Sequence, residues 1–241
     1  MTVCVIGSAG NMGRRYCAIL DHLGVEYEGF DLVTSPSEGR RPGHFLWRLR
    51  LTSTGFTHYI IATPTDTHAE LLRFLMDRFE AVNVLVEKPV TRDPAELRAL
   101  VKAAEKGGHD VYMVNQYAYG NRGAPPGVPR GKGYPGKRTE YNYFNSGKDG
   151  LIWDCIQLLH LAKADIYLAN ISPERVCMIN GRVYRSDATD WLYIKMIRDF
   201  LGRRRWLWPI ADVIETHQRA KEYAQNIDRS AGPIHLHTPA E

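Results

Sequence analysis

The sequence predicts an α/β protein whose first half folds as a doubly wound parallel sheet and whose second half forms a reduced α+β domain. Short apolar runs alternate with helical patterns over the first half, and a glycine-rich turn follows the first run. Strands that alternate with helices form βαβ units, which place a parallel sheet between two layers of helices. The alternation breaks at Tyr119, which predicts a dinucleotide-binding domain over residues 1–118 and a second domain over 119–241.

The composition suits a globular chain without membrane segments. Hydrophobic residues make up 44% of the 241 residues, enough for one large or two small domains. No apolar run reaches the roughly 20 residues that span a bilayer, and the N-terminus lacks the basic region of a signal peptide. The four cysteines form no CxxC pair. We therefore expect a cytoplasmic protein with reduced thiols and no membrane partner.

The expected elements of the first half follow one another at short intervals. Strands are expected at residues 3–6, 27–31, 59–62, 82–86 and 111–114. Helices are expected at residues 12–23, 67–79 and 93–106, where apolar residues recur at helical spacing. Gly107 and Gly108 would end the last of these helices.

The second half begins with a segment of glycines, prolines and bases that predicts a long loop. Strands are then expected at residues 139–144, 176–179 and 182–184, the last two joined by an Asn-Gly hairpin turn. Helices are expected at residues 151–168, 187–201 and 210–226, and the tail after Ser230 is expected to fray. About three strands make a reduced sheet. The sequence leaves undecided whether the protein forms a homo-oligomer through the face of this sheet.

The glycine-rich turn lies between the first strand and the first helix, in the sequence VCVIGSAGNMGRR. Its spacing, G-x-x-G-x-x-G, is a variant of the dinucleotide-binding fingerprint. Glycines let the backbone approach a pyrophosphate, and the helix N-terminus offers free N–H groups to the phosphates. We therefore predict a dinucleotide site here rather than a turn without a ligand. The predicted cofactor-binding residues of this turn are Gly7, Ser8, Gly10, Asn11, Met12 and Gly13.

Asp31, at the end of the second strand, bears on the choice of cofactor. A carboxylate there accepts hydrogen bonds from the adenosine ribose hydroxyls and repels a 2′-phosphate, which favours NAD over NADP. Arg40 and Arg41 lie downstream and could reverse this preference, so NADP stays open.

Two more segments, IIATPTDTHAELL and VLVEKPVTRDPAEL, follow the strands at 59–62 and 82–86. Together with the glycine turn they resemble the Gfo/Idh/MocA family of oxidoreductases, over about residues 1–117. The resemblance implies that the Thr-Pro segment lies along the cofactor, that the lysine of Glu-Lys-Pro stands beside nicotinamide and substrate, and that a cis peptide bond precedes Pro89. It adds Thr63, Pro64, His68, Glu87 and Lys88 to the cofactor site and makes Lys88 catalytic.

Physical chemistry supports this transfer, because ligands of open α/β sheets collect at the carboxyl ends of the strands. A lysine there can hydrogen-bond a reacting hydroxyl, stabilise an alkoxide and relay a proton. The alternative for Lys88 is a solvated side chain at a strand end. The alternative for His68 is local packing in the first turn of a helix, and the two readings of this residue have equal weight.

The apolar helix GLIWDCIQLLHLAKADI resembles the family's helix that carries an aspartate and a histidine into the site. The family's D-x-x-x-H spacing is absent, because Leu158 lies four residues after Asp154 and the histidine, His160, comes later. At about 3.6 residues per turn, Asp154, Gln157 and His160 form one slanted polar stripe. We predict catalytic roles for Asp154 and His160 and a substrate contact for Gln157, against the alternative of a hydrogen-bonded structural stripe.

Asn115 and Tyr117 are further predicted substrate contacts, because they lie where the family's chain crosses between its domains. The bases of the long loop could hold an anionic substrate such as a nucleotide-linked sugar. No metal site is expected, because the nine histidines have no metal-binding spacing. Arg203–Arg205 beside Trp206 could bind nucleic acid, but a net charge of +4 argues against it, and cations also suit a helix C-terminus.

The predicted function is an NAD(P)-dependent oxidoreductase that moves a hydride between nicotinamide and a carbinol carbon. Its partner would be a small sugar, cyclitol or sugar derivative. The alternative is a nucleotide-binding regulatory protein, or a catalytically inactive member, with the same fold.

Overall fold

The computed structural model describes residues 2–31, 55–119, 139–142, 153, 156–157, 166–168, 176–179, 182–185, 190–226 and 234–236. The chain divides into two compact units. The first unit comprises Met1–Val114 and Phe200–Asp212, and the second comprises Asn115–Asp199 and Val213–Glu241. The predicted single boundary after residue 118 therefore differs from this division, because a late segment of the chain returns to the first unit.

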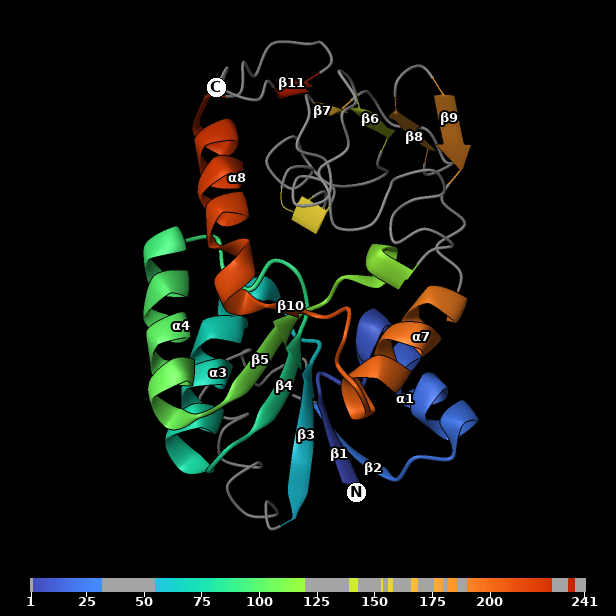
Figure 1. Ribbon diagram of the computed structural model, residues 1–241. Coiled ribbons are helices and arrows are strands. Elements are labelled where there is room, and N and C mark those ends of the chain that lie inside the picture. The colour runs from blue at the N-terminus through green and yellow to red at the C-terminus, as the bar shows by residue number, and fades with distance from the viewer. Residues whose placement is uncertain are drawn as a thin grey trace, which may run out of the picture. The chain divides into compact units, whose positions relative to one another are not determined.

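The first unit contains the predicted parallel sheet, confirmed here with six strands among the described residues (Figure 1). The strands are β1 (Thr2–Ile6), β2 (Tyr27–Phe30), β3 (Phe56–Ile61), β4 (Asn83–Val86), β5 (Asp110–Met113) and β10 (Trp208–Pro209). Their order is β10-β5-β4-β3-β1-β2, and only β10, at one edge, pairs antiparallel with its neighbour. The strand order reverses between β1 and β3, since β2 lies on the other side of β1.

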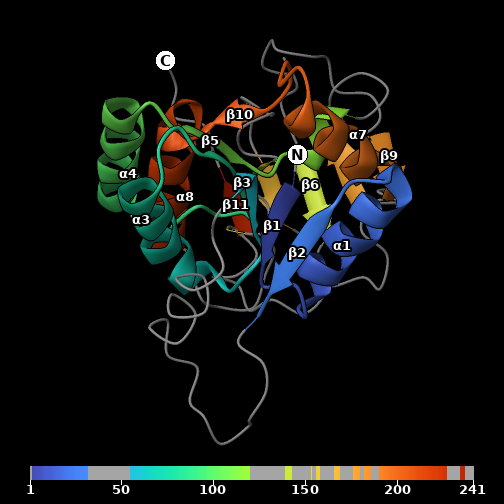
Figure 2. The ribbon, with the colours of Figure 1, turned by 90° about the horizontal axis from the view of Figure 1, so that it is seen from below.

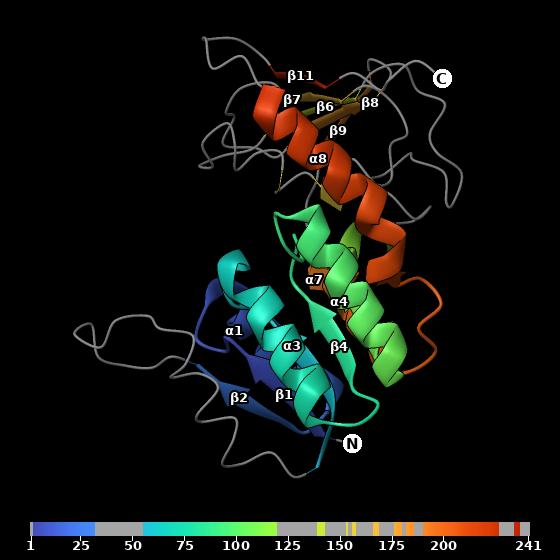
Figure 3. The same ribbon diagram turned by 90° about the vertical axis from the view of Figure 1, so that its left-hand side faces the viewer.

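Helices cover both faces of this sheet, as an α/β fold requires (Figure 2). The helices are α1 (Asn11–Leu23), α3 (His68–Arg78) and α4 (Pro94–Gly107), with a short 3-10 turn, η1 (Thr65–Thr67), before α3. Figure 3 shows α3 and α4 side by side on one face, and α1 lies on the other. Both α1 and α4 end at a glycine in the left-handed conformation, Gly24 and Gly108.

The central strands are apolar on both faces because both faces are covered. Residues 3–6 of β1 and residues 84–86 of β4 are fully buried. This explains why these strands read as continuous apolar runs rather than as alternating patterns.

The late segment, Phe200–Asp212, supplies β10 and so completes the edge of the sheet next to β5. Phe200 is fully buried and packs edge-on against His58 of β3 and Tyr112 of β5. Arg204 forms an ion pair with Asp110 at the start of β5. A two-residue strand such as β10 has no periodicity, so the sequence pattern could not predict it.

The second unit contains a sheet of five strands in the described residues. These are β6 (Thr139–Asn142), β7 (Ile166–Leu168), β8 (Val176–Ile179), β9 (Arg182–Arg185) and β11 (Ile234–Leu236), in the order β11-β7-β6-β8-β9. The helical elements from Asn115 onward are η2 (Gln116–Tyr119), α7 (Asp190–Leu201), η3 (Ile210–Val213) and α8 (Ile214–Asn226). The antiparallel pair of β8 and β9 confirms the two strands predicted around the Asn-Gly turn.

Three predictions for this unit are wrong. The apolar run predicted as one helix to residue 168 ends in strand β7, since a buried helix and a buried strand share the same continuous apolar pattern. The tail predicted to fray contains strand β11, which pairs with β7. The predicted count of about three strands is therefore too small.

None of the helices in the described part of the chain has the length and apolar content that a membrane crossing requires.

Candidate functional site

The turn between β1 and α1 is built around close backbone approaches. Gly7 has a φ of 90°, and a Cβ there would lie 2.7 Å from the carbonyl carbon and oxygen of Ala62, at the end of β3. A Cβ on Gly13 would lie 1.9 Å from the Gly7 carbonyl oxygen. Glycine is therefore required at both positions: at Gly7 for the positive φ, and at Gly13 for the close packing of the helix against the turn.

The N-terminus of α1 is open for an anion. Gly10 is its N-cap, no side chain caps it, and its first turn holds no acidic residue. Ala9, Gly10 and Asn11 are exposed, and Ser8 and Met12 are half-buried. The N–H groups and the positive dipole end of a 13-residue helix are thus presented at the surface, as pyrophosphate binding needs.

Asp31 lies beside this turn. Its Oδ2 accepts a hydrogen bond of 2.6 Å from the Ala9 N–H, and the Phe30 carbonyl accepts from the N–H groups of Gly7 and Ser8. The end of β2 therefore shapes the turn and brings a carboxylate to it. Arg40 and Arg41, the residues that could reverse the cofactor preference, lie outside the described residues.

The carboxyl end of β3 meets the turn at the point where the strand order reverses. In open α/β sheets, ligands bind at this switch point. The Thr67 hydroxyl lies 2.7 Å from both the Thr63 hydroxyl and the Pro64 carbonyl oxygen. These contacts fold the Thr-Pro segment into η1, leaving Thr63 half-buried and Pro64 exposed beside the turn.

His68 joins the ends of two strands from a buried position. Its Nε2 lies 2.8 Å from the Thr63 carbonyl oxygen and its Nδ1 lies 2.9 Å from the Pro89 carbonyl oxygen. Burial lowers the pKa of this imidazole, against the two carbonyl oxygens and the Glu87 charge, which favour the protonated form. With the ring 1% exposed and both nitrogens on backbone oxygens, the geometry favours the positioning of loops over direct cofactor contact.

Glu87 directly follows β4 and is 7% exposed. Its Oε1 accepts a 2.5 Å hydrogen bond from the hydroxyl of Tyr16 in α1, and its Oε2 accepts from the Lys88 N–H at 3.2 Å. The Glu87 N–H donates to the Ile61 carbonyl, which continues the pairing of β3 and β4. The Glu87 carboxylate is therefore buried and bridges Tyr16 of α1 and the backbone of Lys88.

Lys88 is the half-buried residue in an otherwise buried run. Glu87, Pro89, Val90 and Thr91 around it are all buried. The Lys88–Pro89 peptide bond is cis, as the resemblance implied. The backbone that carries the Lys88 side chain is thus held by buried residues on both sides, at the carboxyl edge of the sheet.

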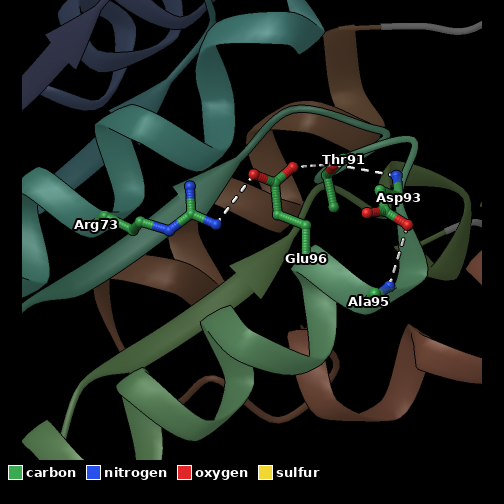
Figure 4. A network of polar contacts seen from close by, with 5 residues as sticks. All are labelled: Arg73, Thr91, Asp93, Ala95 and Glu96. Atoms are coloured by element: carbon green, nitrogen blue, oxygen red, sulfur yellow. Dashed lines mark hydrogen bonds and ion pairs between the residues drawn. The ribbon is translucent and has the colours of Figure 1, made fainter.

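Beyond Pro89, the start of α4 anchors the same loop (Figure 4). Asp93 is the N-cap and accepts from the Ala95 N–H at 3.3 Å, and Pro94 occupies the first turn. Thr91 donates to Glu96 at 2.6 Å, and Glu96 also pairs with Arg73 of α3 at 3.0 Å. The loop that carries Lys88 is therefore tied to α1, α3 and α4.

The predicted residues from Asn115 onward are only partly described. Asp154 and His160, predicted as catalytic, lie outside the described residues, and of Tyr117 only the place in η2 is described. Asn115 and Gln157 are fully buried, and the Gln157 Nε2 donates to the Gln116 Oε1 at 2.8 Å. For Gln157 this contact favours the structural alternative.

Sequence reasoning missed Tyr16, Thr67 and Thr91. Tyr16 was read as an apolar position of the first helix, since its spacing gives no hint of the Glu87 contact. Only the rule that a buried tyrosine hydroxyl seeks a partner could have drawn attention to it. Among the described residues, no three His, Cys, Asp or Glu side chains converge as metal ligands would.

Comparisons with known proteins agree with this geometry. Residues 51–116 match the family model described as an oxidoreductase family with an NAD-binding Rossmann fold, GFO_IDH_MocA. No curated protein matches the sequence significantly.

Several solved structures share the fold at low identity. The WlbA (WbpB) dehydrogenase from Thermus thermophilus, solved with NAD and UDP-GlcNAcA, is 17% identical with a TM-score of 0.67, over 100% of this chain and 97% of that chain. The UDP-N-acetylglucosamine 3-dehydrogenase GnnA from Acidithiobacillus ferrooxidans is 17% identical with a TM-score of 0.65, over 94% and 97%. A Gfo/Idh/MocA family oxidoreductase from Vibrio cholerae is 16% identical with a TM-score of 0.57, over 93% and 97%.

The turn fits the dinucleotide that this family binds. Its glycines leave space that a Cβ would fill, its helix N-terminus is exposed and uncapped, and the Asp31 carboxylate lies against it at the end of β2. In dinucleotide-binding folds, a carboxylate at the end of this strand accepts hydrogen bonds from the ribose hydroxyls. Residues 51–116, which include the Thr-Pro segment and the Glu-Lys-Pro loop, match the NAD-binding Rossmann domain of the Gfo/Idh/MocA oxidoreductase family.

Proposed function

We propose that the protein is an NAD-dependent dehydrogenase that moves a hydride between nicotinamide and a carbinol carbon of a sugar, a cyclitol or a related derivative. The position of Lys88 carries the proposal. Lys88 is half-buried at the end of β4, β4 pairs with β3, and the end of β3 touches the glycine turn at Gly7. A cation is thus held on the edge of the sheet where the cofactor would lie.

Each residue of this edge would have a defined task. The N–H groups at the start of α1 would hold the pyrophosphate, and Asp31 would accept from the ribose hydroxyls and disfavour the 2′-phosphate of NADP. Bound NAD would supply the hydride acceptor. Lys88 would hydrogen-bond the reacting hydroxyl, stabilise the developing alkoxide and relay its proton. His160 or Asp154 would complete this relay or position the substrate, with Asn115 and Tyr117 as the further substrate contacts proposed.

Nucleotide-linked sugars are the first substrates to test. One protein of similar fold was solved with UDP-GlcNAcA, and another is a UDP-N-acetylglucosamine 3-dehydrogenase. The basic residues of the sequence between Tyr119 and Thr139 suit an anionic substrate of this kind. The bulk of a sugar nucleotide offers binding energy away from the reacting carbon.

The test compares cofactor binding with turnover. NADH is expected to bind with a Kd on the order of micromolar, followed by its fluorescence, and Lys88→Ala is expected to leave this Kd within about twofold. The same substitution should lower the rate of NADH formation from UDP-N-acetylglucosamine, myo-inositol or glucose, whichever is the substrate, by about 10²–10⁴-fold.

Lys102→Ala is the matched control, since Lys102 is exposed on α4, and it should change neither quantity. Full turnover by Lys88→Ala would remove Lys88 from catalysis. NADH binding without turnover of any sugar or cyclitol would instead support a nucleotide-binding regulatory protein.

A further inference from the structure

A buried hydrogen bond connects the helix of the glycine turn to the backbone of the proposed catalytic lysine. Tyr16 lies in α1, six residues after the N-cap Gly10, and is fully buried. Its hydroxyl donates to the Glu87 Oε1 at 2.5 Å, and the Glu87 Oε2 accepts the N–H of Lys88 at 3.2 Å. One oxygen of the Glu87 carboxylate thus binds α1, and the other binds the backbone of Lys88, the second residue after β4.

We infer that Tyr16 is a positioning residue that acts through Glu87 to place Lys88 relative to a dinucleotide bound at the start of α1. The inference rests on the proposed function, since it assumes that Lys88 stands beside the nicotinamide. It goes beyond that function because it links the phosphate-binding helix to the catalytic cation through one tyrosine hydroxyl.

The energetics of the contact support this role. A carboxylate that is 7% exposed needs hydrogen-bond donors, because an ionised group without them is costly to bury. A short hydrogen bond to an ionised acceptor is among the stronger and more directional ones in proteins. If the tyrosine hydroxyl is removed, the carboxylate must turn towards other donors. Since the Lys88 N–H is bound to its second oxygen, we expect the backbone of Lys88 to shift as well.

The other ties of the loop do not replace this contact. His68 holds the Pro89 carbonyl and Glu96 holds Thr91, so both fix the loop after Lys88. Among the side-chain contacts described above, the Tyr16–Glu87 pair is the one that holds the loop before Lys88 and connects it to α1. Loss of this pair should therefore move Lys88 without unfolding the loop.

The reactivity of the Lys88 amine reports its position without any substrate. The full chain is treated with acetic anhydride, with and without saturating NAD, and acetylation of Lys88 is followed by mass spectrometry of its peptide. A nicotinamide beside Lys88 should slow this acetylation in the wild-type protein by about five-fold or more, since a bound ligand shields what it contacts.

Tyr16→Phe keeps the ring and removes the hydroxyl. We expect NAD to slow Lys88 acetylation by less than about twofold in this variant, with the Kd of NADH within about threefold of wild type, because a single hydrogen bond to a charged group is lost away from the pyrophosphate. Tyr59→Phe is the matched control. Tyr59 is 1% exposed in β3, and its hydroxyl lies 3.5 Å from the Phe56 carbonyl oxygen, so its variant should keep the full protection.

The outcomes separate this inference from the proposed function. If NAD protects Lys88 equally in wild type and Tyr16→Phe, the positioning role is wrong and the proposed function stands. If NAD binds the wild-type protein but does not protect Lys88, the proposed function fails and the inference fails with it. If Tyr16→Phe does not fold, Glu87→Met gives the same readout, since it keeps the length of the side chain and removes both carboxylate oxygens that accept from the Tyr16 hydroxyl and the Lys88 N–H. Full protection in that variant would overturn the role.

Discussion

At the scale of single residues, His58 shows how burial sets the charge of a side chain. His58 lies in β3, is 6% exposed and packs edge-on against Phe200. Its burial and, secondly, the nearby Arg204 charge lower its pKa from 6.5 to about 4. The imidazole is therefore neutral in the folded protein at pH values where it would be protonated in the unfolded chain.

This pKa shift predicts a loss of stability in acid. Below pH 6.5 the unfolded chain binds a proton that folded His58 does not, so the free energy of unfolding falls as the pH drops from 6.5 towards about 4. The slope is at most about 1.4 kcal/mol per pH unit for this residue. Buried His68, whose pKa is also lowered, acts in the same direction.

Urea unfolding at neutral and at mildly acidic pH measures the effect. His58→Gln should shrink the difference in unfolding free energy between pH 7 and pH 5 by about 2 kcal/mol. His22→Gln is the control, since His22 is exposed at the end of α1, and it should leave the difference intact. An unchanged difference in His58→Gln would show that His58 is not held neutral in the folded protein.

The candidate site could be predicted only where local pattern determines it. Gly7, Gly10 and Gly13 follow a fixed spacing after a strand, and Lys88 follows an apolar strand in a recognisable tripeptide. The partners of His68 and Glu87 come from residues distant in the sequence, so no spacing encodes them. This explains why the sequence pattern left cofactor contact and local packing with equal weight for His68, whose ring nitrogens lie on backbone carbonyl oxygens.

At the scale of elements, the part of the first unit before residue 115 has the predicted order, because its helices show an amphipathic period and its central strands are short apolar runs bounded by turn residues. Asp93-Pro94 begins α4 and Gly108 ends it, as the sequence indicated. The errors fall on elements with no distinctive pattern. Strand β7 lies in a continuous apolar run, while β10 and β11 are two and three residues long, too short for a period of two to be recognised.

The turn and helix α1 give the prediction at this scale. Gly13→Ala would place a Cβ 1.9 Å from the Gly7 carbonyl oxygen, which is backbone and cannot move aside without opening the turn. We expect the Kd of NADH to rise at least about tenfold and the unfolding free energy to fall by about 1–3 kcal/mol. NADH fluorescence titration and urea unfolding measure the two effects.

Gly24→Ala is the control at the opposite end of the same helix. Gly24 has a φ of 64°, and a Cβ there would meet nothing within 4 Å, so the cost should be about 1–2 kcal/mol of left-handed strain. NADH binding should not change. Weakened binding in both variants would show that α1 acts through its stability rather than through the geometry of the turn.

At the scale of the whole molecule, the first unit is discontinuous in sequence. Phe200, Leu207 and Ile210 are buried in or beside a sheet whose other strands all lie before residue 115. No local pattern could reveal this, because the late segment follows a helix that otherwise belongs to the second unit. The sequence could place a change of architecture near Tyr119, but it could not show that the chain returns.

Two aromatic residues of α7 test this division. Phe200 belongs to the first unit and packs against β3 and β5, while Tyr193, seven residues earlier and also buried, belongs to the second. Removing a buried aromatic ring costs about 3–5 kcal/mol. In Phe200→Ala, the amides of β3 and β5 should therefore exchange hydrogen faster, by on the order of 10²-fold or more where exchange requires unfolding of the first unit. Tyr193→Ala should leave these two strands protected.

Two results would contradict this division. Equal loss of protection in both variants would mean that the two units unfold as one. Unchanged protection in Phe200→Ala would mean that the late segment contributes little to the stability of the sheet.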